Sequence, residues 1–239
     1  MAILNYYYAM PLLSLGNLQL DDILGGGIEE NKCTILVGEP GSGKTTLSLQ
    51  FITDPRACNI PCAYLCIDKK PEKIMEQAFA LNKTVNEQIQ SGSLKFVEVS
   101  LQEWAPDQSV NELLLIVQLQ IDAFFKNFNA KRVIVDSLLP HALCGFSKEN
   151  KQYFIREFLQ IIHSYSTTSL AVLYDLDIHQ ALWLDTSIVS DQLLFNRHSD
   201  LDYITYWLEV SKNNHSNQSG KYRFTFNAEK GIELKHRLC

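Results

Sequence analysis

The 239-residue sequence has little glycine and proline, with 11 and 7 residues respectively. This scarcity excludes collagen-like and low-complexity chains. The sequence also lacks any apolar run of about 18 residues, so no transmembrane helix and no membrane partner are expected. Its first fifteen residues contain neither lysine nor arginine, so they lack the basic region with which a secretory signal begins. We therefore expect a cytoplasmic protein.

An excess of positive charge is absent as well, because the formal net charge is −6. Neutralising nucleic-acid phosphates requires a basic face, so a nucleic-acid partner is not favoured. The composition is 46% hydrophobic and 20% charged, which excludes a disordered acidic chain. The length suits one large domain. We place this domain at residues 11–239, after a tyrosine-rich N-terminal extension over residues 1–10.

Three of the six cysteines, Cys58, Cys62 and Cys66, are spaced four residues apart, which raises the question of a metal site. Residues 62–67 have the pattern of a buried strand. In such a strand Cys62 and Cys66 share a face but lie about 13 Å apart, at ~3.3 Å per residue. One metal ion cannot bridge that distance. We therefore interpret these cysteines as small apolar packing residues.

Short apolar runs alternate with amphipathic stretches along most of the chain. The expected strands are 33–37, 62–67, 94–99, 132–135 and 169–174, and the expected helices are 45–53, 71–81, 110–128 and 149–164. The tail differs, because strands are expected at 201–210, 221–226 and 232–235 with no helix between them. This order predicts an α/β fold with a mainly parallel sheet flanked by helices and with antiparallel C-terminal strands.

A glycine-rich segment with the sequence GEPGSGKT begins at residue 38 and satisfies the phosphate-loop pattern G-x-x-x-x-G-K-[ST]. It follows an expected strand and opens an expected helix, which is the context that this motif requires. Backbone N–H groups and the helix N-terminus would cradle the phosphates of ATP or ADP, Lys44 would add a charge, and the Thr45 hydroxyl would bind Mg²⁺. A glycine-rich turn without a ligand would not explain Lys44 followed by Thr45. The expected nucleotide contacts are Gly38, Glu39, Pro40, Gly41, Ser42, Gly43, Lys44, Thr45 and Thr46.

Asp136 ends the apolar strand that begins at Arg132. Ligands gather at the carboxyl ends of parallel strands, so Asp136 is the expected carboxylate ligand of Mg²⁺. The alternative is an aspartate that caps the following turn. Ser137 follows, where several ATPase classes have a water-activating glutamate.

The same position at the end of another strand makes Asp68 a candidate for orienting the attacking water. If its strand lies beside the strand of Asp136 or of the phosphate loop, Asp68 would face the γ-phosphate. The alternative is a solvated aspartate paired with Lys69 or Lys70. Asp175 and Asp177 follow a further strand, and we interpret both as loop carboxylates.

The segments LQLDDILGGGI at 18–28, GEPGSGKTTLSLQF at 38–51 and VDS at 135–137 together resemble the RecA superfamily, and most closely its KaiC-like branch. The segments EVSKN, GKYRFTF and GIEL in the tail resemble the last strands of that branch. The resemblance implies a RecA-like P-loop core that binds ATP and Mg²⁺. It also implies a homo-oligomeric ring, for example a hexamer, with nucleotide between subunits.

Two departures from the KaiC-like pattern bear on catalysis. The branch usually has a pair of glutamates after the second strand, and this chain has Asp68 and Lys69 instead. Where the branch often has a Lys-Leu-Arg stretch that reaches the neighbouring subunit's nucleotide, this chain has Lys212, Asn213 and Asn214. Lys212 remains the candidate for that contact. The lost arginine and the shorter Asp68 both predict slow hydrolysis, or none.

Three functions follow from these patterns. The first is a slow Mg²⁺-dependent ATPase with Lys44 and Asp68 as catalytic groups, whose nucleotide state controls oligomerisation or the binding of a regulatory protein partner. The second is a nucleotide-gated binding module without turnover. The third is a recombinase-like DNA-binding ATPase, but segment 138–150 has few basic residues. The C-terminal tail combines aromatic residues with basic ones, which are Lys221, Arg223, Lys230, Lys235 and Arg237. This pattern is compatible with a surface for single-stranded nucleic acid, but we prefer to interpret it as an ordinary strand with alternating polar and apolar residues.

Overall fold

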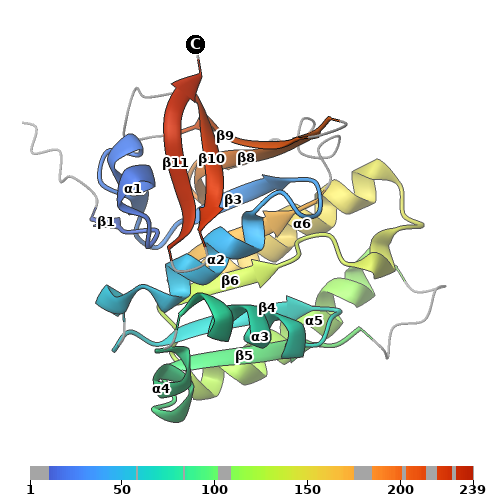
Figure 1. Cartoon of the computed structure of the whole chain (residues 1–239). Helices are drawn as coiled ribbons and strands as arrows, with labels where there is room; N and C mark the ends of the chain where they lie inside the picture. Colours follow the sequence, from blue (N-terminus) through green and yellow to red (C-terminus); the bar gives the residue numbers. More distant parts are fainter. Residues whose placement is uncertain are drawn as a thin grey trace, which may run out of the picture.

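The computed structural model describes residues 11–57, 59–82, 84–101, 109–174, 185–200, 203–213, 220–227 and 230–238. These residues form a nine-stranded sheet of order β11-β10-β9-β8-β3-β7-β6-β4-β5, beside a small β1–β2 pair (Leu12–Leu13 and Ile28–Glu29). Helices cover both faces of the large sheet (Figure 1). Among the helices within these ranges, none has the length and apolar content needed to cross a membrane.

Parallel strands make up the larger part of this sheet. Their bounds are β3 Cys33–Gly38, β4 Cys62–Ile67, β5 Leu94–Val99, β6 Arg132–Asp136 and β7 Thr168–Leu173. All residues of β3, β4, β6 and β7 are buried, as expected for parallel strands covered on both faces. The strand before the phosphate loop, β3, has parallel neighbours on both sides, β7 and β8.

The C-terminal strands are antiparallel. They are β8 (Val189–Ser199), β9 (Ile204–Lys212), β10 (Gly220–Asn227) and β11 (Gly231–Leu238). In Figure 1 this part of the sheet rises away from the strands β4 and β5 and passes beside α2 and α1. It therefore brings the last strand of the chain next to the helix that follows the phosphate loop.

Alternating side chains of the sheet divide the core in two. Ile35 and Val37 of β3 pack with α5 (Val110–Asn127) and α6 (Lys148–Ser164), whereas Leu36 faces α1 (Leu18–Ile23), α2 (Lys44–Thr53) and α3 (Glu72–Leu81). The start of α5 is fixed by a capping box, in which the Ser109 hydroxyl and the Glu112 carboxylate each bind the other residue's backbone N–H.

The predicted fold class is confirmed, and so are the twelve predicted strands and helices, with ends that differ by a few residues. The sequence analysis missed the short elements α1, α4 (Val85–Gln90), β1 and β2, and also the long strand β8. Cys62 and Cys66 lie in β4 as buried free cysteines. Burial raises the pKa of each thiol to about 12, so both stay protonated. Cys58 and residues 1–10 lie outside the described residues.

Candidate nucleotide-binding site

The phosphate loop lies between the end of β3 at Gly38 and the start of α2 at Lys44. Gly43, the N-cap of α2, has a φ of 110°, and a Cβ atom there would lie 3.2 Å from the Phe226 ring. Only glycine adopts this backbone conformation without strain. A Cβ atom on Gly38 would lie 2.2 Å from the Phe195 carbonyl oxygen. Glycine at both positions is therefore required by the course of the chain.

The loop opens into a pocket of about 720 Å³. Loop residues Pro40 to Thr46 line it on one side, and the other lining residues include Gln77 of α3, Tyr174 after β7, and Phe226 and Asn227 of β10. The loop residues from Pro40 to Thr46 predicted from the sequence therefore face one pocket. The carbonyl oxygens of Gly38 and Glu39 contact Lys44 instead.

The Lys44 side chain is folded back onto the loop and is only 2% exposed. Its ammonium donates to the carbonyl oxygens of Gly38 and Glu39 at 2.6 and 2.7 Å, and to the Ser42 hydroxyl at 3.2 Å. Burial lowers the pKa of Lys44 to about 8, and nearby Lys69 contributes to the lowering while Asp136 opposes it. A phosphate that replaced the loop carbonyls as partner would favour the charged form of Lys44.

The Asp136 carboxylate, at the end of β6, is fully buried and is held by three donors. The Tyr64 hydroxyl donates to Oδ2 at 2.6 Å, the Lys69 ammonium to Oδ1 at 2.6 Å and the Tyr174 hydroxyl to Oδ1 at 3.1 Å. Burial, followed by the negative charge of Asp136, raises the pKa of both phenols, so both remain donors. The buried charge is thus compensated by Lys69 and fully hydrogen-bonded, as such a group requires.

Tyr174 connects this carboxylate to the phosphate loop. The Tyr174 hydroxyl donates to Asp136, and Tyr174 lines the same pocket as Thr45. The ammonium groups of Lys44 and Lys69 lie 4.3 and 5.6 Å from the centre of the Tyr174 ring. One tyrosine therefore contacts Asp136, shares a pocket with Thr45 and lies near both lysines.

The donor set around Asp136 does not suit Mg²⁺ while Lys69 holds this position. Mg²⁺ demands near-ideal octahedral oxygen coordination at about 2.0–2.1 Å. Here an ammonium group lies 2.6 Å from one carboxylate oxygen and a phenol 2.6 Å from the other. Thr45, the second predicted metal ligand, lines the adjoining phosphate-loop pocket. The role of Thr45 and Asp136 as metal ligands stays a prediction that this geometry does not favour.

Asp68 lies directly after β4, and β4 pairs with the Asp136 strand β6, as the sequence argument required. Asp68 is exposed and adopts a left-handed backbone with a φ of 54°. Its N–H donates to the Val99 carbonyl at 2.9 Å, and its carboxylate has no hydrogen-bond partner within the described parts of the chain. The residue that reaches Asp136 is the neighbouring Lys69. Catalysis by Asp68 stays a prediction.

Lys212 does not meet the phosphate loop of its own chain. Its ammonium donates to the Val189 carbonyl at 2.7 Å, and Val189 lies opposite Cys33, the first residue of β3. The loop follows the other end of that strand. Contact between Lys212 and a neighbouring subunit's nucleotide stays a prediction. Asp175 and Asp177 lie outside the described residues.

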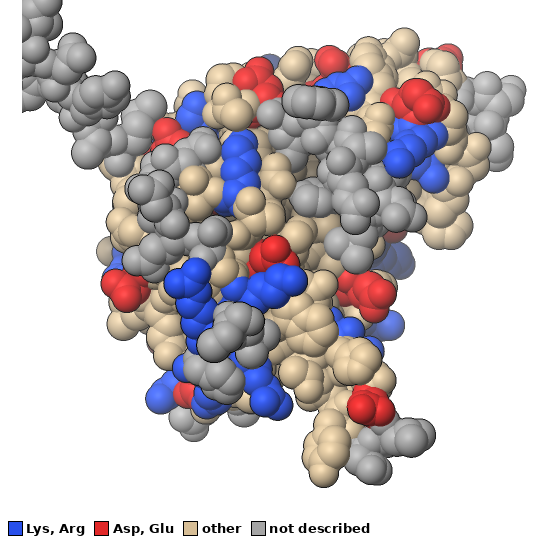
Figure 2. Space-filling model, turned by 90° about the horizontal axis from the view of Figure 1, so that it is seen from above, with Lys and Arg blue, Asp and Glu red and all other residues tan. Residues whose placement is uncertain are grey.

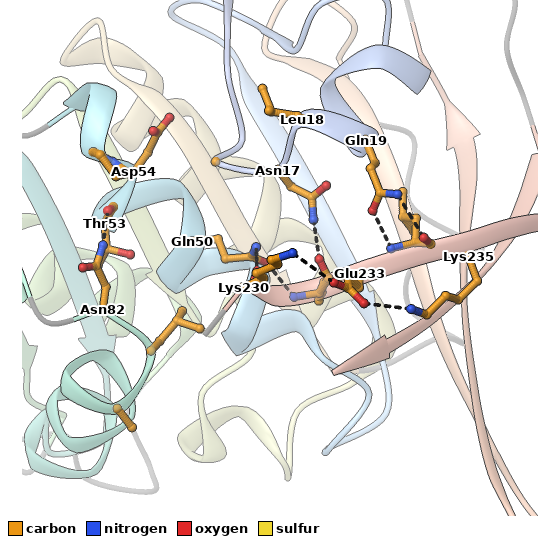
Figure 3. Close-up of a pocket in the computed structure, with 16 residues that line it drawn as sticks. Asn17, Leu18, Gln19, Gln50, Thr53, Asp54, Asn82, Lys230, Glu233 and Lys235 are labelled. Atoms are coloured by element: carbon orange, nitrogen blue, oxygen red, sulfur yellow. Dashed lines mark hydrogen bonds and ion pairs between the residues drawn. The ribbon is translucent and has the colours of Figure 1, made fainter. Parts of the chain in front are cut away.

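A larger pocket of about 980 Å³ lies beyond the C-terminal half of α2 (Figure 3). Two of the amide side chains that line it are already occupied by the backbone of β11 and the residue before it. Gln50 donates to the Lys230 carbonyl at 2.7 Å and accepts from the Ile232 N–H at 3.1 Å. Gln19 makes a similar pair of bonds with Leu234. We interpret this pocket as part of the structural junction at which α2 packs against β11, and we call this junction the seam.

The charges of the C-terminal strands are partly paired. Lys221 lies 3.3 Å from Glu209, and Lys230 and Lys235 lie 3.8 and 2.7 Å from Glu233. Figure 2 shows acidic and basic side chains interspersed over the face seen from above. These pairs reduce the positive charge that a nucleic-acid surface would need.

Two site residues, Tyr64 and Tyr174, were not predicted from the sequence. The pairing of Lys69 with Asp136 was not predicted either. A signal for Tyr64 was present, because it shares a face of its strand with Cys66, which lies opposite Asp136. This signal can be recognised only when β4 is known to lie next to β6. Phe226, beside Gly43, was likewise seen only as part of an alternating strand.

Comparisons with known proteins agree with the fold and with the family resemblance. The family model described as "ATPase: KaiC" matches residues 15–178. A solved structure of the KaiC-like protein PH0186 from Pyrococcus horikoshii has a TM-score of 0.71 at 18% identity, and the match covers 95% of this chain and all of that one. This likeness concerns the fold.

Curated relatives share local sequence. The circadian clock protein KaiC2 of Synechocystis is 26% identical over 155 residues, which are 64% of this chain and 26% of that protein. The DNA repair and recombination protein RadA of Metallosphaera sedula is 30% identical over 176 residues, 70% of this chain and 50% of that protein. The chain thus spans about a quarter to a half of these relatives. The family model covers most of the chain, and the matched residues include the phosphate loop. The chain therefore belongs to the KaiC family of ATPases.

Proposed function

We propose that this chain binds ATP and ADP at the phosphate loop, and that nucleotide occupancy, with slow hydrolysis at most, controls its self-assembly or its affinity for a regulatory partner. The observation that carries the proposal is the loop itself. Residues Pro40 to Thr46 line one pocket with Lys44 buried at the start of α2. This arrangement supplies the backbone donors, the helix terminus and the cation that a polyphosphate requires.

Slow turnover follows from the surroundings of Asp136. The Asp136 carboxylate is bound to Lys69, Tyr64 and Tyr174 and is therefore not free to accept a proton from water. The exposed Asp68 has no described partner that would orient it. A general base must lie within hydrogen-bond reach of the proton that it takes, and a small displacement costs on the order of 10²-fold in rate.

Control of assembly is supported by mass action. A ligand that binds one state at 100 times its dissociation constant stabilises that state by about 2.7 kcal/mol, with no need for hydrolysis. Lys212 lies at the opposite end of β3 from the loop of its own chain, so the contact with nucleotide that we propose for it is with that of another subunit. The ring assembly implied by the family resemblance provides such a neighbour.

The test combines light scattering with phosphate release, on the purified chain without nucleotide, with ADP and with ATP, beside a Lys44→Ala variant. We expect the particle mass of the wild type to depend on nucleotide and that of Lys44→Ala to be constant. Phosphate release should be slow but above that of the variant. Equal release by both proteins would remove hydrolysis from the proposal, and an unchanged wild-type mass would remove the control of assembly.

A further inference from the structure

The P-loop motif does not explain why the Lys69 side chain reaches Asp136. Its ammonium donates to Oδ1 of Asp136 at 2.6 Å, and Asp136 is the carboxylate at the end of the strand β6, where P-loop proteins usually hold a divalent cation. The Asp136 side chain is 0% exposed, whereas that of Lys69 is 34% exposed. The lysine thus extends from the surface to a buried charge.

A buried carboxylate needs a positive partner and hydrogen bonds to its remaining lone pairs. Lys69 supplies the charge, and Tyr64 and Tyr174 supply two further hydrogen bonds. Asp136 therefore meets both requirements from the chain's own residues. A divalent cation at Oδ1 would have to displace the ammonium or lie against it, and the two positive charges would repel each other.

Two lysine side chains at the site offer positive charge to a metal-free polyphosphate. Lys44 and Lys69 carry positive charges beside the carboxylates of Asp136 and Glu39, and the positive charge of Lys69 helps to lower the pKa of Lys44. Both ammonium groups lie near the ring of Tyr174, which lines the phosphate-loop pocket. Lys69 is half-buried at this edge and has the long flexible stem that lets a lysine follow a phosphate.

We propose that the Lys69 ammonium takes the charge-compensating place of a divalent cation, so that this chain binds nucleoside di- and triphosphates in their metal-free form. The inference rests on the proposed nucleotide binding and adds the chemical form of the ligand. Lys69 is a binding and specificity residue in this view, and it takes no part in a covalent step.

The test is equilibrium binding of a fluorescent ADP analogue, and of ATP by calorimetry, in excess Mg²⁺ and in excess EDTA. We expect the wild-type dissociation constant to change by less than about threefold between the two conditions. Loss of one charged hydrogen-bonding group changes binding by about tenfold or more. Lys69→Gln should therefore weaken binding in EDTA by at least about tenfold, and Lys69→Arg should restore most of it.

Lys70→Gln is the matched control, because it removes the same charge from the exposed neighbouring residue. It should leave binding in EDTA within about twofold of the wild type. Circular dichroism melting of each variant shows whether it is folded, and the wild-type comparison of Mg²⁺ with EDTA needs no variant.

Wild-type binding that requires Mg²⁺ would overturn the inference while the proposed function stands. Equal weakening by Lys69→Gln and Lys70→Gln in EDTA would overturn it too. Absence of nucleotide binding in both conditions would overturn the proposed function itself, so the two failures are distinguishable.

Discussion

The guanidinium of Arg132 lies 3.7 Å from the Asp54 carboxylate, and their side chains are only 3% and 2% exposed. Arg132 opens the strand β6 and also donates to the Phe51 carbonyl at 2.7 Å, so it joins the central sheet to the end of α2. Asp54 has a second partner, Arg56, whose side chain is 51% exposed. One carboxylate is therefore shared by a buried and an exposed arginine.

This arrangement gives a prediction about stability. Arg132→Ala leaves the buried Phe51 carbonyl without this donor, and the cost of an unsatisfied buried acceptor should lower the free energy of unfolding by about 1–3 kcal/mol even though Asp54 keeps Arg56 as a partner. Arg56→Ala removes an exposed partner of the same Asp54 and should cost only about 0.2–1 kcal/mol. Urea unfolding monitored by circular dichroism gives both values. Equal losses for the two variants would show that burial of Arg132 does not matter.

A second prediction concerns pH. In the empty site Lys44 has a pKa lowered to about 8, and a bound phosphate would need its charged form. Nucleotide affinity should therefore be full below pH 8 and fall as the pH rises through 8, by about tenfold at pH 9. The stability of the empty protein follows the opposite sign: it rises from pH 8 to the ordinary lysine pKa of 10.5, because over this range the folded protein has lost a proton that the unfolded chain still binds.

Binding of the fluorescent ADP analogue at pH 7, 8 and 9 measures this effect. Lys44→Arg keeps its charge at all three values and should bind with a flat pH profile, even if more weakly. A wild-type affinity that stays constant to pH 9 would contradict the lowered pKa.

A third prediction concerns Gly43. With a φ of 110° and the Phe226 ring 3.2 Å from the site of a Cβ atom, alanine there would displace the loop. Gly43→Ala should abolish detectable nucleotide binding and lower the free energy of unfolding by about 1–3 kcal/mol. Gly92→Ala is the control, since Gly92 also has a positive φ of 76° but faces open space. It should lose stability and keep its affinity for nucleotide.

A fourth prediction concerns the seam between α2 and β11. Gln50→Leu leaves the buried N–H of Ile232 without its acceptor, which should cost about 1–3 kcal/mol. Amide hydrogen exchange at Ile232 should become faster. Gln160→Leu makes the same substitution at an exposed position of α6 and should leave both quantities unchanged within error. Unchanged exchange at Ile232 in Gln50→Leu would count against the seam.

Local patterns in the sequence predicted the interior strands well, and the reason is physical. The strand β4 was predicted with its observed bounds because a fully buried parallel strand is a continuous apolar run. The strand β8 was missed because its first residue, Val189, is followed by Ser190, Asp191 and Gln192, polar residues that are typical of a loop. Two of these, Ser190 and Asp191, are fully buried, and Ser190 donates to Asp191 at 2.6 Å.

The phosphate loop was predictable because its chemistry lies within a few consecutive residues. The surroundings of Asp136 were not, because they depend on strand order. Lys69 and Asp136 are 67 positions apart in sequence, and they meet only because β4 lies next to β6. From the sequence, Lys69 was considered only as an alternative partner of Asp68, beside Lys70, whereas in the folded chain it pairs with Asp136 across the sheet.

The place of the C-terminal strands has a consequence for biosynthesis. Phe226 packs against Gly43, and Lys230 and Ile232 hold Gln50 of the helix that the loop opens. A ribosome releases these supports roughly 180 residues after the loop itself, in the order in which chains emerge. Until then the loop lacks these contacts, so a nascent chain acquires a finished phosphate pocket only after β10 and β11 have left the ribosome.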